Sequence, residues 1–170
     1  RKALREIKKL DHRLLPEVQS VGNVTVSLTT VGKRIENIAP YAIYSILCQT
    51  RLPNRIVLNI DQTKWSENNI PVIIKKLQLA GLEINFCEDV GPHTKFLPTL
   101  QKYPDDVIIT VDDDIFYEPN MIEDLIDTYK KQSQPTIVCR WATIMEKKNG
   151  SYIPYDDWKM VQTGREPGRY

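Results

Sequence analysis

The sequence predicts an α/β fold, a Rossmann-like three-layer α/β/α sandwich with a mainly parallel sheet. Short apolar runs rich in β-branched residues alternate with segments in which apolar residues recur at helical spacing. Gly, Pro and Asn mark most of the boundaries between them. Strands that alternate with helices form βαβ units, whose strands are parallel and whose crossovers are right-handed.

The first sixteen residues predict a basic amphipathic helix or linker, set apart from a main domain over residues 17–170. Six Lys or Arg side chains stand against two acids in residues 1–15, and apolar residues recur between them until Pro16. Such a helix can lie on anionic headgroups, which would give the protein a peripheral membrane contact. Packing against its own protein is the other interpretation.

The next segments predict three strands and two helices in alternation. Val24–Thr30 has the period of a strand, residues 35–50 carry a helical apolar stripe, and Arg55–Ile60 forms the second strand. A second helix over residues 70–81 ends at a glycine C-cap, and Leu82–Cys87 follows as the third strand.

The second half of the chain predicts a further strand and helix before a less regular end. A loop at Gly91-Pro92 and a short helix near Lys95–Lys102 lead into a buried fourth strand, Val107–Val111. A helix follows Asn120 and runs to about Lys131. A strand around Thr136–Cys139 and a hairpin turn at Asn149-Gly150 complete the expected elements.

The composition limits the binding partners and the cellular compartment that we expect for this protein. The 23 basic and 22 acidic side chains leave a formal charge of +1, which gives no general field for holding nucleic acid. Cys48, Cys87 and Cys139 are widely spaced among apolar neighbours, as expected of buried free thiols in a reducing compartment. Without a long apolar run or a signal-peptide pattern, we expect a cytoplasmic location. The start at Arg1 suggests a piece of a longer protein, and the sequence gives no indication of its oligomeric state.

Three consecutive acids, Asp112, Asp113 and Asp114 (the aspartate trio), end the fourth predicted strand. Like charges about 4 Å apart repel by roughly 1 kcal/mol in water and about 4 kcal/mol near a protein surface, so the trio favours a cationic partner. In an extended segment Asp112 and Asp114 would face together while Asp113 points oppositely. Two carboxylates at this edge suit Mg²⁺ or Mn²⁺ with substrate phosphates.

Several segments together resemble one known family, the family-2-type glycosyltransferases with a GT-A fold. They are Val26–Thr30, Ser45–Thr50, the stretch from Leu52-Pro53 through Asp61, and Val111–Asp114 followed by Pro119, in the family's order within residues 22–130. The resemblance is to the bacterial branch, in which the loop Gly91–Lys95 precedes the DXD strand.

This resemblance implies transfer of a sugar from a nucleotide diphosphate, usually uridine-linked, to a hydroxyl of a glycan or lipid-linked glycan. It implies that Asp114 binds the metal directly and that Asp112 meets the ribose, the metal or a metal-bound water. Asp113 would orient the sugar. Negative charge grows on the diphosphate as the sugar leaves, and a metal that bridges its oxygens stabilises that transition state.

The resemblance also implies a nucleotide site. It places Thr29 and Thr30 under the base and ribose with Arg34 nearby, and Asp61 against the uracil edge. Lys95 would reach the phosphates. For Asp61 and the threonines, turn formation and strand propensity are the alternative explanations.

The acceptor side is where the resemblance is incomplete. An inverting transferase needs a general base, for which Asp157 is the candidate among the late acids, with Asp156 and Glu166 as alternatives. We therefore expect a donor-binding half that is incomplete at the C-terminus. Two other functions remain open, a non-catalytic nucleotide-binding module and a sugar nucleotidyltransferase, although the latter would carry a Gly-rich phosphate loop where this chain has only Gly32.

Overall fold

The computed structural model describes residues 23–134 and 136–161, so the predicted basic helix over residues 1–16 lies outside the described residues. The chain divides into two compact units, Arg1–Asp124 and Leu125–Tyr170. The extent of the predicted main domain, residues 17–170, stays a prediction.

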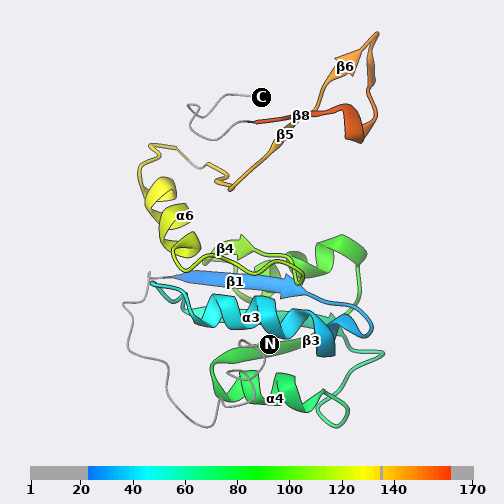
Figure 1. Cartoon of the computed structure of the whole chain (residues 1–170), viewed down its shortest axis with the longest axis vertical. Helices are drawn as coiled ribbons and strands as arrows, with labels where there is room; N and C mark the ends of the chain where they lie inside the picture. Colours follow the sequence, from blue (N-terminus) through cyan, green and yellow to red (C-terminus); the bar gives the residue numbers. More distant parts are fainter. Residues whose placement is uncertain (1–22, 135, 162–170) are drawn as a thin grey trace. The chain divides into compact units, whose positions relative to one another are not determined.

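The first unit contains a four-stranded, all-parallel sheet, which confirms the predicted α/β class. Its strands lie in the order β3-β2-β1-β4, and Figure 1 shows them with β1 in blue. Their bounds are β1 Val24–Thr29, β2 Arg55–Asp61, β3 Leu82–Cys87 and β4 Val107–Thr110. The fourth strand is less buried than predicted, because within the described sheet it pairs only with β1 and exposes Thr110.

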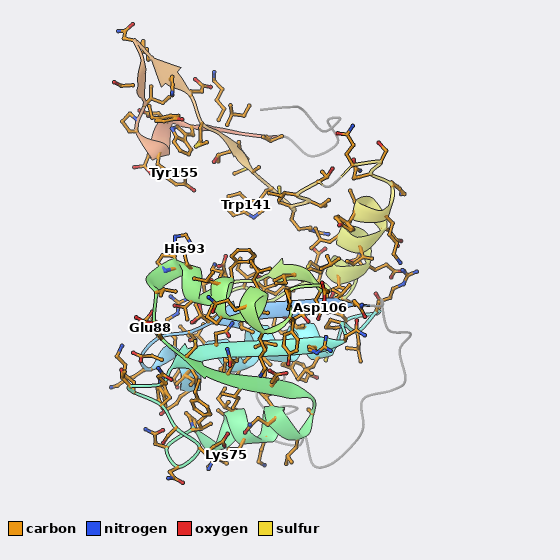
Figure 2. The ribbon with its side chains drawn as sticks, turned by 180° about the vertical axis from the view of Figure 1, so that it is seen from behind. Lys75, Glu88, His93, Asp106, Trp141 and Tyr155 are labelled. Carbon is orange, nitrogen blue, oxygen red and sulfur yellow. The ribbon has the colours of Figure 1, made fainter. Side chains whose placement is uncertain are left out.

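Helices cover both faces of this sheet. They are α2 (Arg34–Asn37), α3 (Ala39–Leu47) and α4 (Val72–Leu79) on one face, and the 3₁₀ helix η1 (Gly91–Lys95) with α5 (Leu97–Lys102) on the other. Right-handed crossovers require this division, since the chain moves from β1 to β2 to β3 in one direction and then returns past β1 to β4. Figure 1 shows α3 between β1 and β3 in the view, and Figure 2 shows the opposite face with η1 at the label of His93.

The core lies between the sheet and the face that α3 and α4 cover. Its side chains are fully buried and aliphatic, and each contributes roughly 1.5–3 kcal/mol by leaving water. They are Val26, Leu28, Leu58 and Ile60 from the strands, and Ile35, Ile43, Ile46, Ile74 and Leu77 from the helices.

The predicted helix over residues 35–50 is wrong in one respect, because the structure divides it at Ile38, where φ is −126°. Pro40 explains the break, since it lacks an N–H group and its ring clashes with the carbonyl four residues earlier. Phe96, with φ −123°, separates η1 from α5 in the same way, two residues before Pro98. The end of α4 follows the prediction, with Gly81 at φ +106° just after the helix.

Helix α6 (Met121–Lys130) begins in the first unit and ends in the second, whose remaining residues have little regular structure. Strand β5 (Thr143–Ile144) pairs with β8 (Lys159–Met160), and β6 (Lys147–Lys148) with β7 (Ser151–Tyr152). The hairpin turn at Asn149-Gly150 is confirmed, with φ +52° and +81° as a type I′ turn requires. The strand predicted around Thr136–Cys139 is wrong, because that run pairs with no described strand and leaves Ile137 94% exposed.

The three cysteines are free, as predicted, but they are not buried. Cys48 and Cys139 are exposed and Cys87 is half-buried, where burial raises the pKa of its thiol. Cys48 follows the buried Ile46 by two positions, and about 200° of helical rotation turns it away from the core. No helix in the described ranges is long and apolar enough to cross a bilayer.

Candidate functional site

The candidate site lies where the strand order of the sheet reverses. Connections leave β1 for β2 on one side, whereas β4 lies on the other side, and ligands of open α/β sheets bind at such a point beyond the carboxyl ends of the strands. Thr30, just after β1, donates a 2.5 Å hydrogen bond to Oδ2 of Asp113, just after β4. This bond joins the two strand ends on either side of the reversal.

Arg34 holds two members of the aspartate trio together. Its Nη2 lies 2.5 Å from Oδ1 of Asp113 and 2.8 Å from Oδ2 of Asp114. Asp113 is only 8% exposed and accepts from both Thr30 and Arg34, so its carboxylate is fully engaged by the protein. The Arg34 Nε is buried and has no hydrogen-bond partner.

Asp112 has a different cationic partner, because its Oδ1 pairs with Nζ of Lys95. The backbone of Lys95 is fixed, since its carbonyl accepts a 2.6 Å hydrogen bond from Ser27 Oγ. The side chains of Asp112 and Asp114 remain 49% and 53% exposed. One lysine, one arginine and one hydroxyl thus offset the mutual repulsion of the trio.

The predicted orientation of the trio is wrong. We expected Asp113 to point away from Asp112 and Asp114, but Asp113 and Asp114 meet at the same Arg34 nitrogen. Alternation holds only in an extended strand, and here β4 ends at Thr110 and a turn covers residues 113 and 114.

Tyr117 belongs to this site although the sequence analysis did not identify it. Its hydroxyl accepts a 2.7 Å hydrogen bond from the Asp112 N–H, and its own N–H donates to Ser45 Oγ at 3.0 Å. Burial raises the pKa of the phenol to about 12, and the nearby aspartates add to the shift. The phenol therefore stays neutral and fixes the backbone at the start of the trio.

The segment Ser45–Thr50, one of those that carry the family resemblance, positions the loop after the trio. Gln49 Nε2 donates to the Glu118 carbonyl at 2.6 Å, and Gln49 Oε1 accepts from the Ile122 N–H at 3.0 Å. Thr50 N–H donates to the Pro119 carbonyl at 2.7 Å. This segment therefore has a structural role. Its contacts join residues some seventy positions apart, which no local sequence pattern indicates.

A pocket lies beside the trio, at the carboxyl ends of β1, β2 and β3. The empty space within it is about 270 Å³ when the part that is open solvent is included. Thr29, Thr30 and Asp61, three of the predicted nucleotide-binding residues, line it, together with Val31, Gly32, Lys64, Trp65, Asp89 and Thr94. Since Thr30 both lines the pocket and bonds Asp113, the pocket and the trio are contiguous.

Asp61 is held as an anion in this pocket. Its carboxylate pairs with Lys64 at 2.7 Å and accepts from the N–H and hydroxyl of Thr63 at 2.8 and 2.7 Å. The bond from Lys64, followed by those from Thr63, lowers the pKa of Asp61 to about 2. Asp61 can therefore only accept hydrogen bonds at neutral pH. Trp65, which the sequence analysis did not identify, contributes the large aromatic side chain of the pocket.

A buried polar network fixes the loop that carries Lys95. Asn59 Nδ2 donates to Ser27 Oγ and Thr99 Oγ1 at 3.0 and 2.8 Å, and the two hydroxyls lie 2.6 Å apart. These bonds tie β1, β2 and α5 together beneath η1. Figure 2 shows the side of the sheet to which η1 belongs, with Glu88 and His93 labelled near the carboxyl edge.

Two side chains of the candidate site are suitable ligands for a hard divalent cation. The carboxylates of Asp112 and Asp114 are accessible oxygen donors of the kind that Mg²⁺ and Mn²⁺ prefer. Residues 23–134 and 136–161 contain no group of three or more side chains arranged to hold a metal. Magnesium commonly takes one or two carboxylates and completes its shell with phosphate oxygens and water, so these residues fit a metal that arrives with a phosphate.

Asp157, the predicted general base, belongs to the second unit. It ends the 3₁₀ helix η2 (Tyr155–Asp157) and is exposed. There the Trp158 indole donates to the Ile153 carbonyl at 3.0 Å and packs edge-on against Tyr155. The structure describes Asp157 only within this unit, and its catalytic role stays a prediction.

Comparison of the sequence with protein-family models and with curated proteins found no match.

Proposed function

We propose that the first unit binds a nucleotide-sugar, with a UDP-sugar as the preferred donor, and that the protein transfers the sugar to a glycan or lipid-linked glycan hydroxyl. The observation that carries this proposal is the continuity of pocket and trio through Thr30 at the reversal point of the sheet. A base in the pocket would leave its phosphates beside the acids and their cations.

The chain's own residues have distinct roles in this proposal. Asp61, an obligate acceptor, would take a hydrogen bond from an imide N–H of the base, while Thr29 and Thr30 shape the wall on which base and ribose lie. Arg34 and Lys95 supply cationic donors for the diphosphate.

Asp112 and Asp114 are the residues that would hold the divalent cation. When bound, Mn²⁺ or Mg²⁺ supplies charge stabilisation for the departing diphosphate. Asp113 keeps Arg34 and Thr30 in place, so in this proposal it acts by positioning its neighbours, and its contact with the sugar stays an expectation from the family resemblance.

The acceptor side and the cellular location are further parts of the proposal. Asp157 would take the proton from the acceptor hydroxyl. A cytoplasmic protein that contacts the membrane through its basic N-terminal segment would meet lipid-linked acceptors there.

A thermal-shift experiment tests donor binding. UDP, GDP and ADP are each added with and without Mn²⁺, and a ligand at about 100 times its Kd adds roughly 2.7 kcal/mol of stability. We expect a clear shift with UDP plus Mn²⁺ that Asp114→Ala abolishes. Asp105→Ala is the matched control, because Asp105 is an exposed acid before β4, at the opposite edge of the sheet. Equal shifts with all three nucleotides, or shifts that do not need metal, would contradict the proposal.

Turnover separates the proposed activity from the two alternatives. Release of UDP from a UDP-sugar in the presence of an acceptor supports transfer. Exchange of pyrophosphate would instead support a sugar nucleotidyltransferase, and binding without turnover would support a non-catalytic module.

A further inference from the structure

Every member of the aspartate trio already has a partner within the protein. Asp112 pairs with Lys95, Asp114 with Arg34, and Asp113 with both Arg34 and Thr30. The carboxylate oxygens that a metal would use are therefore the same groups that these two cations contact. A metal that binds by itself has to displace Lys95 and Arg34 or tolerate their positive charge nearby.

Both cations are able to change partners. The side chains of Arg34 and Lys95 are 38% and 30% exposed, so each has a face toward solvent. Arg34 is incompletely bonded where it lies, because its buried Nε has no acceptor. For Lys95 only the side chain has to move, since Ser27 anchors its backbone.

We propose that, when a nucleotide binds, Lys95 exchanges Asp112 for the diphosphate and Arg34 exchanges Asp114 for it while keeping its bond to Asp113, and that this exchange makes metal binding depend on the nucleotide. The inference rests on the proposed function. Phosphate oxygens accept charge-assisted hydrogen bonds from both side chains, with a fork geometry that suits arginine. Asp112 and Asp114 then lose their internal counterions and would be free to hold a divalent cation.

The exchange has a thermodynamic signature that simple charge pairing lacks. Each cation opposes the metal in the absence of nucleotide and favours the nucleotide in the presence of metal. Removing one cation should therefore change two affinities in opposite directions. Linkage requires that metal and nucleotide raise each other's affinity by the same factor, so that shared factor should fall in the variant.

Lys95→Gln is the variant of choice, because its side chain is partly exposed and its loss leaves the buried Asp113 with both of its partners. Lys33→Gln is the matched control. Lys33 is exposed and adjacent to Arg34 in the chain, yet within the described ranges it makes no ion pair with the trio. The control removes the same charge from the neighbourhood without removing a contact.

The experiment measures binding of Mn²⁺ by electron paramagnetic resonance, with and without UDP, and binding of UDP at saturating Mn²⁺ by calorimetry. Without UDP, Lys95→Gln should bind Mn²⁺ roughly 2- to 5-fold more tightly, as expected when a partly exposed ion pair is removed. With Mn²⁺, it should bind UDP about tenfold more weakly, as expected for one charge-assisted hydrogen bond. Lys33→Gln should leave the factor that links metal and nucleotide unchanged.

The outcomes separate the two proposals. If the wild type binds UDP with Mn²⁺ but Lys95→Gln binds Mn²⁺ alone no better than Lys33→Gln does, the exchange is wrong and the proposed function stands. If the wild type binds no UDP, both fall. Arg34→Gln tests the same exchange at Asp114, and its unfolding temperature shows whether it folds. The folded variant should bind Mn²⁺ alone more tightly and UDP with Mn²⁺ more weakly. Weaker binding of Mn²⁺ alone would also overturn the exchange.

Discussion

Replacing Gln49 with leucine should destabilise the first unit and loosen the loop after the aspartate trio. Gln49 is 3% exposed, and its amide bonds the Glu118 carbonyl and the Ile122 N–H. Leucine has a similar volume but offers neither donor nor acceptor. The buried Ile122 N–H would therefore lose its partner, whereas the Glu118 carbonyl would lose one bond and keep the one from the Met121 N–H at 3.1 Å.

The expected loss of stability follows from these two groups. The unsatisfied Ile122 N–H costs about 2 kcal/mol, and the bond lost at the Glu118 carbonyl, which keeps its bond from Met121, costs about 1 kcal/mol. The larger apolar surface of leucine returns about 1 kcal/mol. The net change of about 2 kcal/mol corresponds to a fall in Tm of roughly 7 °C for a unit of this size.

Urea unfolding followed by far-ultraviolet circular dichroism measures this change. Gln101→Leu, on the exposed surface of α5, is the matched control and should stay within about 0.5 kcal/mol of wild type. Because Gln49 and Ser45 hold the loop that contains Tyr117, UDP with Mn²⁺ should also bind more weakly to Gln49→Leu. A loss of stability no larger than in the control would refute the assignment of Gln49 as the support of this loop.

Two further predictions concern the pocket. The pKa of Asp61 is lowered to about 2 from its ordinary 3.8, so its carboxylate stabilises the folded state above pH 4 and this contribution is lost as pH falls from about 4 to 2. Melting curves of wild type and Asp61→Asn should therefore converge over that range, and a constant difference would be evidence against the bonds to Lys64. UDP with Mn²⁺ should quench the fluorescence of Trp65, whereas pyrophosphate should not, and quenching that persists in Trp65→Phe would place the base elsewhere.

The sheet could be predicted because its signals are local. The bounds of β3 are those predicted from the run of alternating and apolar residues, and β2 is longer by one residue. The end of α4 and the type I′ hairpin could also be predicted from local signals. Gly81 and Gly150 stand at these two positions, where φ is positive. The break at Ile38 was also signalled, by Pro40, but in the prediction of one helix over residues 35–50 the apolar periodicity was given more weight than the missing N–H group.

For the candidate residues, the sequence could predict that they lie near one another but not which contacts they make. A parallel sheet brings the ends of all its strands to one edge, which is why Asp61 and Thr30 line one pocket although 31 positions separate them. The pairing of Arg34 with Asp113 and Asp114 depends instead on where β4 ends and a turn begins. The end of β4 is set by its pairing with β1. The orientation of the three aspartates could therefore not be predicted from their own sequence.

A comparison of the two edges of the sheet supports the candidate site at the carboxyl edge. At the amino edge, which Figure 2 marks with Asp106, that acid bonds Arg55 and Thr25 at 2.5 and 2.6 Å, and its side chain is 9% exposed. The Arg55 guanidinium also lies 4.3 Å from the centre of the Tyr103 ring, which closes the cluster on itself. At the carboxyl edge the same kinds of residue leave Asp112 and Asp114 about half exposed beside a pocket. A cluster that served only to hold strand ends together would gain from burial, because exposed ion pairs contribute little to stability. The exposure of these two acids is therefore better explained by a ligand that completes their surroundings than by the stability of the fold.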